Sequence, residues 1–475
     1  MRLSFLKGLY SNTGYYLGFI GIIATLFVIT HPINISGLEL YFLLPFIYSL
    51  CVIRNKEVFL YHVDGFGLKC FYLVTFVRYV ILPVYASSNG IIGTYNNLNS
   101  SYYGYGIFVQ ILELLVSYTV IRLYYPKVYN KISSRLVIGK QYYNSPGIGG
   151  LFLGCCMIGV VVLRGHMGAI TEMARFLVVT EKYDMEADFW TYDLWAIQVF
   201  FSYLVILVTS YFMQRNDRKD SWTNVIIPLV LAFLSCSIIL TNNRMTMVYY
   251  ALSGLCVLNA AFPKKSKILS TAMIGVMLTV IISFTLMKNF GVDISSESAD
   301  VSNNDGVSTL SAYVCGVDNI AHTCDMYSRN GSLFGIKNFF SMIYNFCMPT
   351  RLPFLHGLLF KGTPTAVDLA CQSTEMVSVA GETYFWGGGM YLGWLFDIIA
   401  VYIIVRLLIY FEIHTKLELD LGKKYIYNWL AVLFGIFMCY CIQTLWNNTT
   451  YMPLFLSCAL WVNKKLRFKR TEVLR

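Results

Sequence analysis

The sequence predicts an all-α protein that crosses a membrane many times. Of its 475 residues, 57% are hydrophobic and 13% are charged, and the mean hydropathy is +0.58. A soluble domain carries about 25% charged residues. Apolar runs of about 17 or more residues recur along the whole chain, which is enough for many bilayer crossings. A spanning segment must satisfy its own backbone hydrogen bonds in lipid, so we expect each to be an α-helix.

We predict twelve spans, nine in residues 1–287 and three in residues 389–475, which end in a basic tail. The first apolar run follows a basic segment without a convincing small-residue cleavage site, so we expect a retained span. Residues 288–388 are too polar to cross a membrane. The predicted spans lie at about 14–30, 39–53, 70–86, 106–124, 147–163, 194–213, 224–240, 245–262, 268–287, 389–411, 428–446 and 450–462.

Loops that are rich in Lys and Arg alternate along the chain with loops that are poor in them. By our count 26 of the 36 fall on one side of the predicted spans, nine on the other side or at its edge, and Arg78 lies inside a span. Short cytoplasmic loops carry the excess of basic residues. We therefore expect both termini in the cytoplasm and two outer loops, 164–193 and 288–388. Because the basic residues lie in short loops beside spans, nucleic acid is a poor candidate partner.

The large outer loop, 288–388, divides into parts by composition. Residues 291–306 are acidic and rich in Ser and Asn, which indicates a solvated tip, and residues 308–327 favour a helix. Residues 332–347 are apolar but short for a span, which fits a helix on the membrane surface. The loop cysteines form two disulfides in one reading and stay free in buried helices in the other; they are Cys315, Cys324, Cys347 and Cys371. The absence of a Cys-x-x-Cys spacing disfavours zinc.

Five arginines gather on the predicted outer face. Arginine presents a fixed fork of donors that suits phosphate oxygens, so these residues are candidates for binding a lipid-linked anionic headgroup. The alternative for each is snorkelling or pairing with a nearby acid. The five are Arg164, Arg175, Arg244, Arg329 and Arg351.

The end of the large loop carries a candidate general base. Glu382 stands where the loop re-enters the membrane, and Tyr384 and Trp386 follow it. These rings offer a platform for sugar faces, or they are ordinary residues of the interfacial aromatic belt. His166, His322 and His356 also lie on the outer side, where each is a candidate base or a plain surface residue.

Three ionisable residues fall inside predicted spans. Arg78 and Glu113 lie in adjacent spans and are able to pair, either as structural glue or as part of a transport route. Asp397 has no obvious partner in the sequence, and we expect it to orient an arginine such as Arg244.

No Walker loop, dinucleotide fingerprint, H-E-x-x-H or G-x-S-x-G motif is present in the sequence. Energy for a synthetic reaction would then have to arrive within the substrate. A polyprenyl diphosphate sugar meets this requirement, because diphosphate is a good leaving group.

Two motifs and the topology resemble the Wzy-type polymerases of O-antigen and capsular polysaccharide. Residues 380–393, Ala-Gly-Glu-Thr-Tyr-Phe-Trp-Gly-Gly-Gly-Met-Tyr-Leu-Gly, are similar to the Gly-Glu-x-Tyr-x-x-Gly-Gly-x-x-Gly pattern that closes the large loop in that family. Residues 241–244, Thr-Asn-Asn-Arg, resemble its Ser/Asn-Arg at the head of a span. One departure concerns the Arg-x10-Gly pattern of some members, because here Arg164 is followed eleven residues later by Arg175.

The resemblance implies a fold and an activity. The fold would be similar to metal-independent GT-C-like membrane glycosyltransferases, without a cofactor, in the bacterial cytoplasmic membrane. The activity would be transfer of a glycan from undecaprenyl diphosphate onto the next lipid-linked repeat unit, with a chain-length regulator and a flippase as partners. Arg244, Arg164, Arg175 and Arg351 would hold diphosphate, and Glu382 or a loop histidine would activate the acceptor hydroxyl.

Three other functions compete with the polymerase. An O-antigen ligase shares the topology and favours a histidine in the large loop. A lipid-linked oligosaccharide flippase would place charged residues in spans of both halves and would lack so large an outer loop. A structural partner in polysaccharide export would tolerate the loss of every outer arginine.

Overall fold

The computed structural model describes residues 2–55, 65–134, 147–163, 188–214, 222–237, 244–275, 306–330 and 377–465. Throughout these ranges the secondary structure is helical and contains no strand, as the sequence predicts. Among the described residues, four helical segments are long and apolar enough to cross a membrane, and five more are apolar but shorter. The four are Thr13–Thr30, Gly67–Asn89, Ser100–Ile132 and Gly393–Leu417. This composition is typical of a multi-pass membrane protein.

The chain divides into two compact units, and three C-terminal helices contribute residues to both. These shared helices are α18 (Gly393–Leu417), α19 (Leu421–Gly435) and α20 (Ile442–Lys465). The rest of the first unit consists of α1 (Arg2–Thr30), α2 (Leu43–Arg54), α3 (Gly67–Phe76), the π-helical turn η2 (Val77–Ile81), α4 (Leu82–Asn89), α5 (Ser100–Ser133), α12 (Gly306–Val314), α13 (Val317–Asn330), α17 (Val379–Trp386) and the 3-10 turn η7 (Phe437–Cys439).

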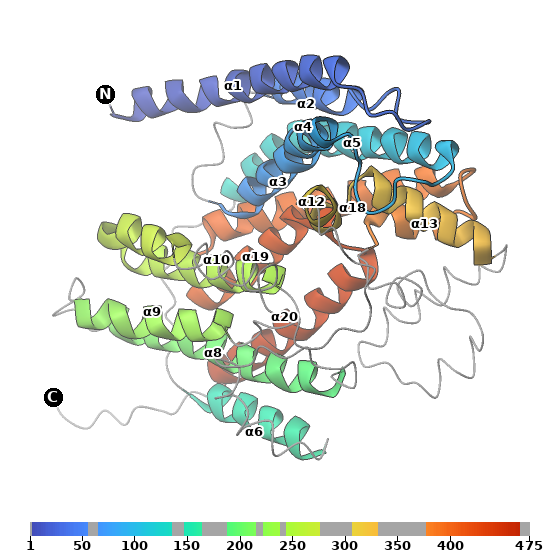
Figure 1. Ribbon diagram of the computed structural model, residues 1–475. Coiled ribbons are helices and arrows are strands. Elements are labelled where there is room, and N and C mark those ends of the chain that lie inside the picture. The colour runs from blue at the N-terminus through green and yellow to red at the C-terminus, as the bar shows by residue number, and fades with distance from the viewer. Residues whose placement is uncertain are drawn as a thin grey trace, which may run out of the picture. The chain divides into compact units, whose positions relative to one another are not determined.

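Two neighbouring pairs of helices in the first unit run antiparallel, and one pair runs parallel. α1 and α2 lie side by side (Figure 1) and run antiparallel, because Gly18 lies against Ile53 while Gly21 lies against Pro45. The α3–η2–α4 segment runs antiparallel to α5, where ring and polar contacts follow one another in reverse order along the two chains. α18 runs in the same direction as α5, because Gly393 meets Tyr105 and Tyr402 meets Tyr124.

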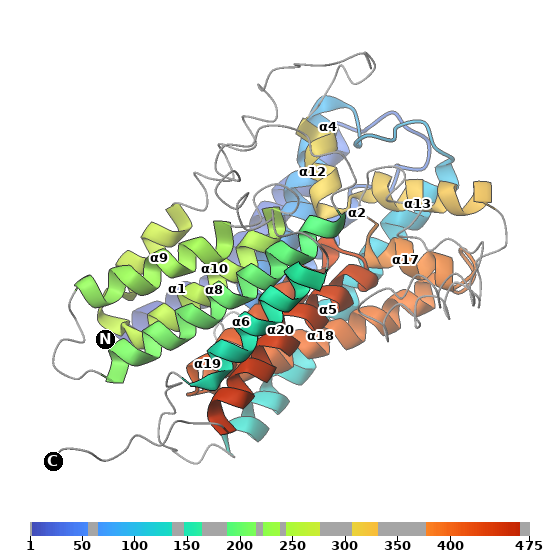
Figure 2. The same ribbon diagram turned by 90° about the horizontal axis from the view of Figure 1, so that it is seen from below.

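The second unit contains a layer of apolar helices. Its helices α8, α9 and α10 lie next to one another, and α6 packs against α8 (Figure 2). The first part of α19 packs among them: the Tyr425 hydroxyl donates to Ser202 Oγ at 2.9 Å, and Trp429 meets Tyr249 edge to face. Besides its share of α18, α19 and α20, the described part of the unit contains α6 (Ile148–Leu163), α8 (Asp188–Gln214), α9 (Trp222–Ser237), α10 (Arg244–Ala261), the 3-10 turn η6 (Pro263–Lys265) and the helical residues 266–275.

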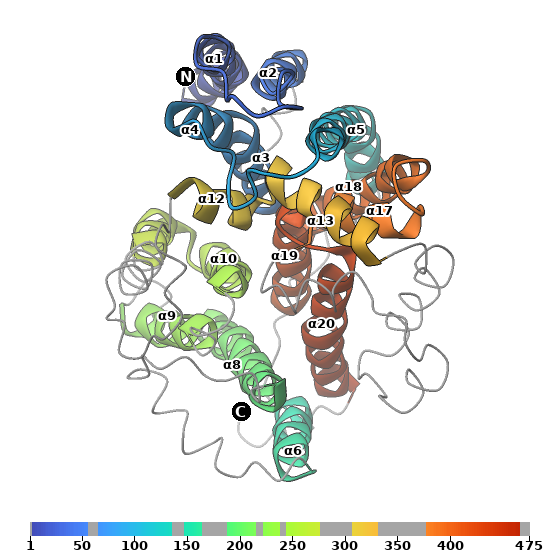
Figure 3. The same cartoon turned by 45° about the vertical axis from the view of Figure 1, so that its right-hand side comes forward.

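The described middle of the large loop packs onto the helices of the first unit. α12 contacts α4, and α13 contacts α5 and α17, so that the two short helices form a row across these elements (Figure 3). One helix was predicted over 308–327. The structure instead has two, because Cys315 adopts a left-handed backbone conformation with φ 50° and Gly316 follows it. The predicted acidic tip at 291–306 and surface helix at 332–347 lie outside the described residues, apart from Gly306 at the start of α12.

The structure also bears on three further predictions. The predicted span 428–446 is interrupted, because α19 ends at Gly435, η7 follows, and α20 begins at Ile442. The predicted last span, 450–462, is the interior of the longer α20. Cys315 and Cys324 carry free thiols, both fully buried, which excludes a disulfide between them. Cys347 and Cys371 lie outside the described residues.

Candidate functional site

The motif at the end of the large loop folds into one short buried helix and a glycine turn. The Ser378 hydroxyl begins α17 by accepting a hydrogen bond from Gly381 N–H at 3.1 Å, a typical N-terminal cap. Every residue of α17 is buried. Gly388 and Gly389 have φ values of 66° and 100°, a left-handed region in which glycine avoids strain, and they turn the chain into α18. This motif therefore connects a packed helix directly to a candidate membrane span.

Glu382 is held at the first turn of another helix. Its side chain is 2% exposed, and Oε2 accepts from the N–H groups of Ile442 and Gln443, at 2.6 and 3.3 Å, where α20 begins. A carboxylate at a helix N-terminus satisfies donors that lack an intrahelical partner and interacts favourably with the helix dipole. Burial raises the pKa of Glu382 from its usual 4.5 to about 7, although the two amides act in the opposite direction. The side chain thus caps a helix, and its burial brings its pKa close to neutral pH.

The two aromatic residues predicted as a sugar platform are packed inside the first unit. Tyr384 is 4% exposed and meets the rings of Tyr105 and Tyr327 edge to face, with centroids 5.0 and 5.3 Å away. Trp386 is 8% exposed and packs with Phe385 and its neighbours. In this conformation both rings serve packing, and their role toward sugar stays a prediction.

α13 carries two of the predicted outer residues. The side chain of Arg329 is 73% exposed and pairs with Asp325 at 2.7 Å, one turn earlier. The ring of His322 stacks on Tyr95, with centroids 3.8 Å apart and planes 5° apart. Burial lowers the pKa of His322, which favours the neutral imidazole near pH 7. Arg329 therefore remains accessible to an anion, whereas His322 lies against the loop between α4 and α5.

Most of the other predicted site residues lie outside the described part of the chain. These are Arg164, Arg175, Arg351, His166 and His356. Arg244 is the first residue of α10, as expected for the head of a span, and only its backbone is described. Whether these residues meet Glu382 stays a prediction.

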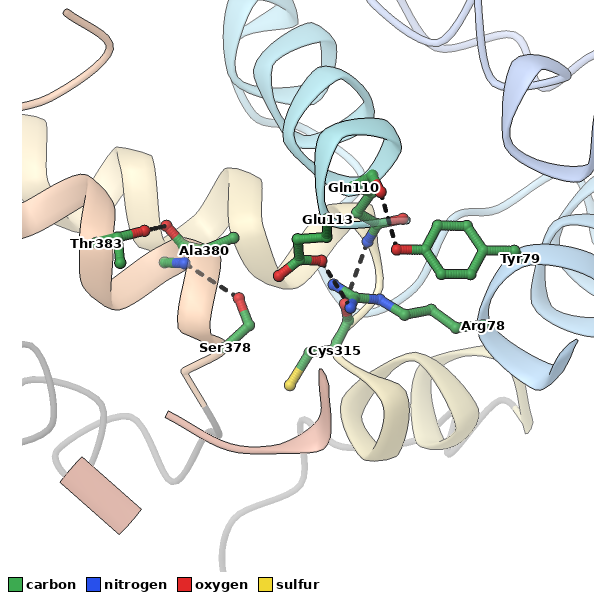
Figure 4. A network of polar contacts seen from close by, with 9 residues as sticks. Arg78, Tyr79, Gln110, Glu113, Cys315, Ser378, Ala380 and Thr383 are labelled. Carbon is green, nitrogen blue, oxygen red and sulfur yellow. Dashed lines mark hydrogen bonds and ion pairs between the residues drawn. The ribbon is translucent and has the colours of Figure 1, made fainter. Parts of the chain in front are cut away.

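The predicted pair inside the spans is confirmed. Arg78 Nη1 donates to Glu113 Oε2 at 2.9 Å, and both side chains are fully shielded from solvent (Figure 4). Arg78 belongs to the π-helical turn η2, a geometry that often marks functional positions. Asp397 interacts electrostatically with both members of the pair. Asp397 therefore lies within electrostatic reach of this pair, and its predicted role toward Arg244 stays a prediction.

A polar network joins this pair to the large loop. Gln110 lies one turn before Glu113 on α5 and donates through Nε2 to the Cys315 backbone carbonyl at 3.2 Å, while the backbone carbonyl of Gln110 accepts from the Tyr79 hydroxyl at 2.9 Å (Figure 4). Gln110 is ten residues into α5, about 15 Å along it at 1.5 Å per residue. The break between α12 and α13 therefore contacts α5 far along the helix from its first residue.

Asp318 is a second loop carboxylate that the sequence analysis missed. It is 1% exposed and accepts from the Ser311 hydroxyl and from Thr94 N–H at 3.1 Å, which fastens α13 to the loop before α5. Burial raises the pKa of Asp318 to about 6, although these hydrogen bonds act in the opposite direction. Its position one residue into α13 gives no sequence signal beyond an acid in a helical first turn.

Comparisons with known proteins found no matching family model, curated protein or solved structure.

Proposed function

We propose that this chain is a membrane glycosyltransferase that polymerises undecaprenyl-diphosphate-linked oligosaccharide repeat units into O-antigen or capsular polysaccharide. It would act on the outer face of the bacterial cytoplasmic membrane, with twelve spans, a GT-C-like fold and cytoplasmic termini. The observation that carries the proposal is the position and the pKa of Glu382. This residue lies in the family-like motif, directly before a candidate span, and its pKa of about 7 suits a general base at neutral pH.

The chemistry requires one proton acceptor and a positively charged cradle. The acceptor sugar hydroxyl would lose its proton to Glu382 as its oxygen attacks the anomeric carbon of the donor glycan. The bond from that carbon to the diphosphate oxygen would break, and the leaving diphosphate would take the developing charge. Arginine stabilises such charge by bidentate hydrogen bonds, a role proposed for Arg244, Arg164, Arg175 and Arg351.

Glu382 is 2% exposed, so a substrate would reach it only after a change of conformation, and a movement of α13 is our candidate for that change. The described α13 packs against α17, and Thr323 lies beside Gly381. Loop closure over a reacting site excludes water and completes the catalytic groups, and such motions often limit turnover. The polymerase reading therefore treats this conformation as the closed one.

A lipid-linked oligosaccharide flippase is the second candidate. The observation that favours it is the gathering of Arg78, Glu113 and Asp397 inside helices that are able to span a membrane, because intramembrane charges mark transport routes and proton relays. A flippase would use these residues and would have no use for a base in the α17 motif.

Gene deletion distinguishes the candidates. Loss of a polymerase leaves surface glycans that carry a single repeat unit, whereas loss of a flippase or a ligase leaves no surface repeat. The deleted strain is then complemented with wild type, Glu382→Gln, Arg244→Ala or Glu39→Gln, and glycan length is examined on a gel with protein levels matched. Glu39 is an exposed carboxylate of the first unit and serves as the control. Long ladders from the Glu382→Gln or Arg244→Ala variants would overturn the site assignment, and absence of surface repeats after deletion would overturn the polymerase.

A further inference from the structure

The first unit contains a buried carboxylate that differs from every other one in the described residues. Buried acids in these ranges are Glu113, Asp318, Glu382, Asp397 and Glu412. Four accept hydrogen bonds: Glu113 from Arg78, and the other three from backbone N–H groups. Asp397 is 0% exposed, and within the described part of the chain neither of its oxygens has a hydrogen-bond partner.

The charges around Asp397 limit its charge state and the kind of ligand that it is able to bind. Arg78 and Glu113 already compensate each other, so an ionised Asp397 would add an uncompensated negative charge to the interior. Burying an isolated carboxylate is so costly that such groups take up a counter-charge instead. Arg78 still has two nitrogens, Nε and Nη2, without a partner among the described residues, yet neither bonds to Asp397. An anionic ligand would worsen the charge balance, which leaves a proton or a metal cation.

The ligand geometry favours the proton. A metal ion such as Ca²⁺ takes 6–8 oxygen ligands. In the described ranges no three His, Cys, Asp or Glu side chains gather closely enough to hold a metal. A proton needs only one carboxylate oxygen.

We propose that Asp397 is a proton-binding site, neutral while the Arg78–Glu113 pair stays ionised beside it. The inference does not depend on glycan transfer, because it rests on burial, pairing and charge alone. The ionisable groups around the site are Arg78 and Tyr79 from η2, and Glu113 and Tyr105 from α5. Cys439 of η7 and Cys315 of the α12–α13 turn lie beside Arg78.

Release of the proton has a defined structural consequence. The O–H bond of Asp397 breaks, the proton passes to water, and both electrons stay on the carboxylate. That new charge attracts Arg78, whose free Nε and Nη2 are then able to donate to it while Nη1 keeps Glu113. Since Arg78 lies in a π-helical turn, a local change of helical register would accommodate the movement.

Infrared spectroscopy of the full-length protein in lipid nanodiscs tests the site. All variants carry Glu382→Gln, because Glu382 is itself partly protonated near pH 7. We expect a protonated-carboxyl C=O band at pH 7.5 that shifts in D2O, disappears in Asp397→Asn and persists in Glu39→Gln. Glu113→Gln should also abolish the band, because Arg78 then pairs with Asp397 and keeps it ionised. Persistence of the band in Asp397→Asn would overturn the proposal.

Two further measurements distinguish the proton from its alternatives. Asn closely resembles a neutral Asp, so Asp397→Asn should keep the melting temperature of the parent protein at pH 7.5; a large decrease would indicate an ionised carboxylate and overturn the proposal. The band should also be unchanged when sodium replaces choline at constant ionic strength. Its loss in sodium would assign the site to a monovalent cation and overturn proton binding.

Discussion

Replacing Glu382 by Gln separates the hydrogen bonds of this residue from its ability to accept a proton. A Gln side chain keeps an oxygen that is able to accept from the N–H groups of Ile442 and Gln443, so the start of α20 stays capped. It has no carboxylate to take a proton from an acceptor hydroxyl. On the polymerase proposal, the Glu382→Gln variant folds, reaches the membrane and makes no long glycan.

The pKa of Glu382 fixes the expected pH dependence of stability. The folded chain binds the Glu382 proton more tightly than the unfolded chain, because burial raises the pKa from 4.5 to about 7. The contribution of this residue to stability is therefore fully present below about pH 4.5 and is lost as the pH rises to about 7. Each pKa unit corresponds to 1.36 kcal/mol, so the loss is about 3 kcal/mol, with no further change above pH 7.

Thermal unfolding of detergent-purified protein, followed by tryptophan fluorescence at pH 5 and pH 8, measures this difference. Glu382→Gln should be more stable relative to wild type at pH 8 than at pH 5, while Glu39→Gln should show no such change. Glu382→Ala loses the cap as well and should be less stable than Glu382→Gln by about 0.5–2 kcal/mol. The reasoning is refuted if the Glu382→Gln variant is less stable than wild type at pH 8, or if it supports normal ladders.

Three other predictions concern stability and binding. Arg78→Met should destabilise the protein by about 3–5 kcal/mol in chemical unfolding, because Glu113 loses its partner. The double variant Arg78→Met with Glu113→Leu should recover most of this loss. An equal loss of stability in the single and double variants would contradict the reasoning. Gly393→Ala should lower the melting temperature, because its new methyl would lie 2.9 Å from a backbone atom of α17, whereas Gly104→Ala meets open space and should raise or preserve it. Arg329→Ala should change stability by less than about 0.5 kcal/mol, since the ion pair is exposed, and shorter glycans at normal protein levels would show that this residue binds substrate.

The sequence predicts the helical class and one buried interaction well, for a physical reason. Apolar composition determines that spans are helices, and a charge inside a span must find a partner, so Arg78 and Glu113 in adjacent spans were natural candidates. Asp397 could not be placed, because its neighbours depend on how α18 packs against α5. The break between α19 and α20 was missed because residues 436–441 are apolar or aromatic and leave the hydropathy pattern continuous.

Glu382 shows a related limit of sequence reasoning. Its hydrogen-bond partners are 60 and 61 residues further along the chain, at a helix start that the sequence had placed inside a span. Neither its burial nor its pKa follows from the motif alone. The motif located the residue, and the packing of α17 against the start of α20 determined its chemistry.

The buried carboxylates of the first unit differ in what compensates them, and this difference separates the two candidate functions. Glu382 is able to accept hydrogen bonds from the backbone N–H groups whether or not it is protonated. Its titration therefore changes its ability to act as a base and leaves its hydrogen-bond partners the same. Asp397 has no hydrogen bond within the described residues, so its titration changes the charge seen by Arg78 and favours a new pairing within the spans. A polymerase requires the first behaviour and a transporter requires the second. Glycan ladders that need Glu382 but tolerate Asp397→Asn would therefore support the polymerase, and the reverse pattern would support the flippase.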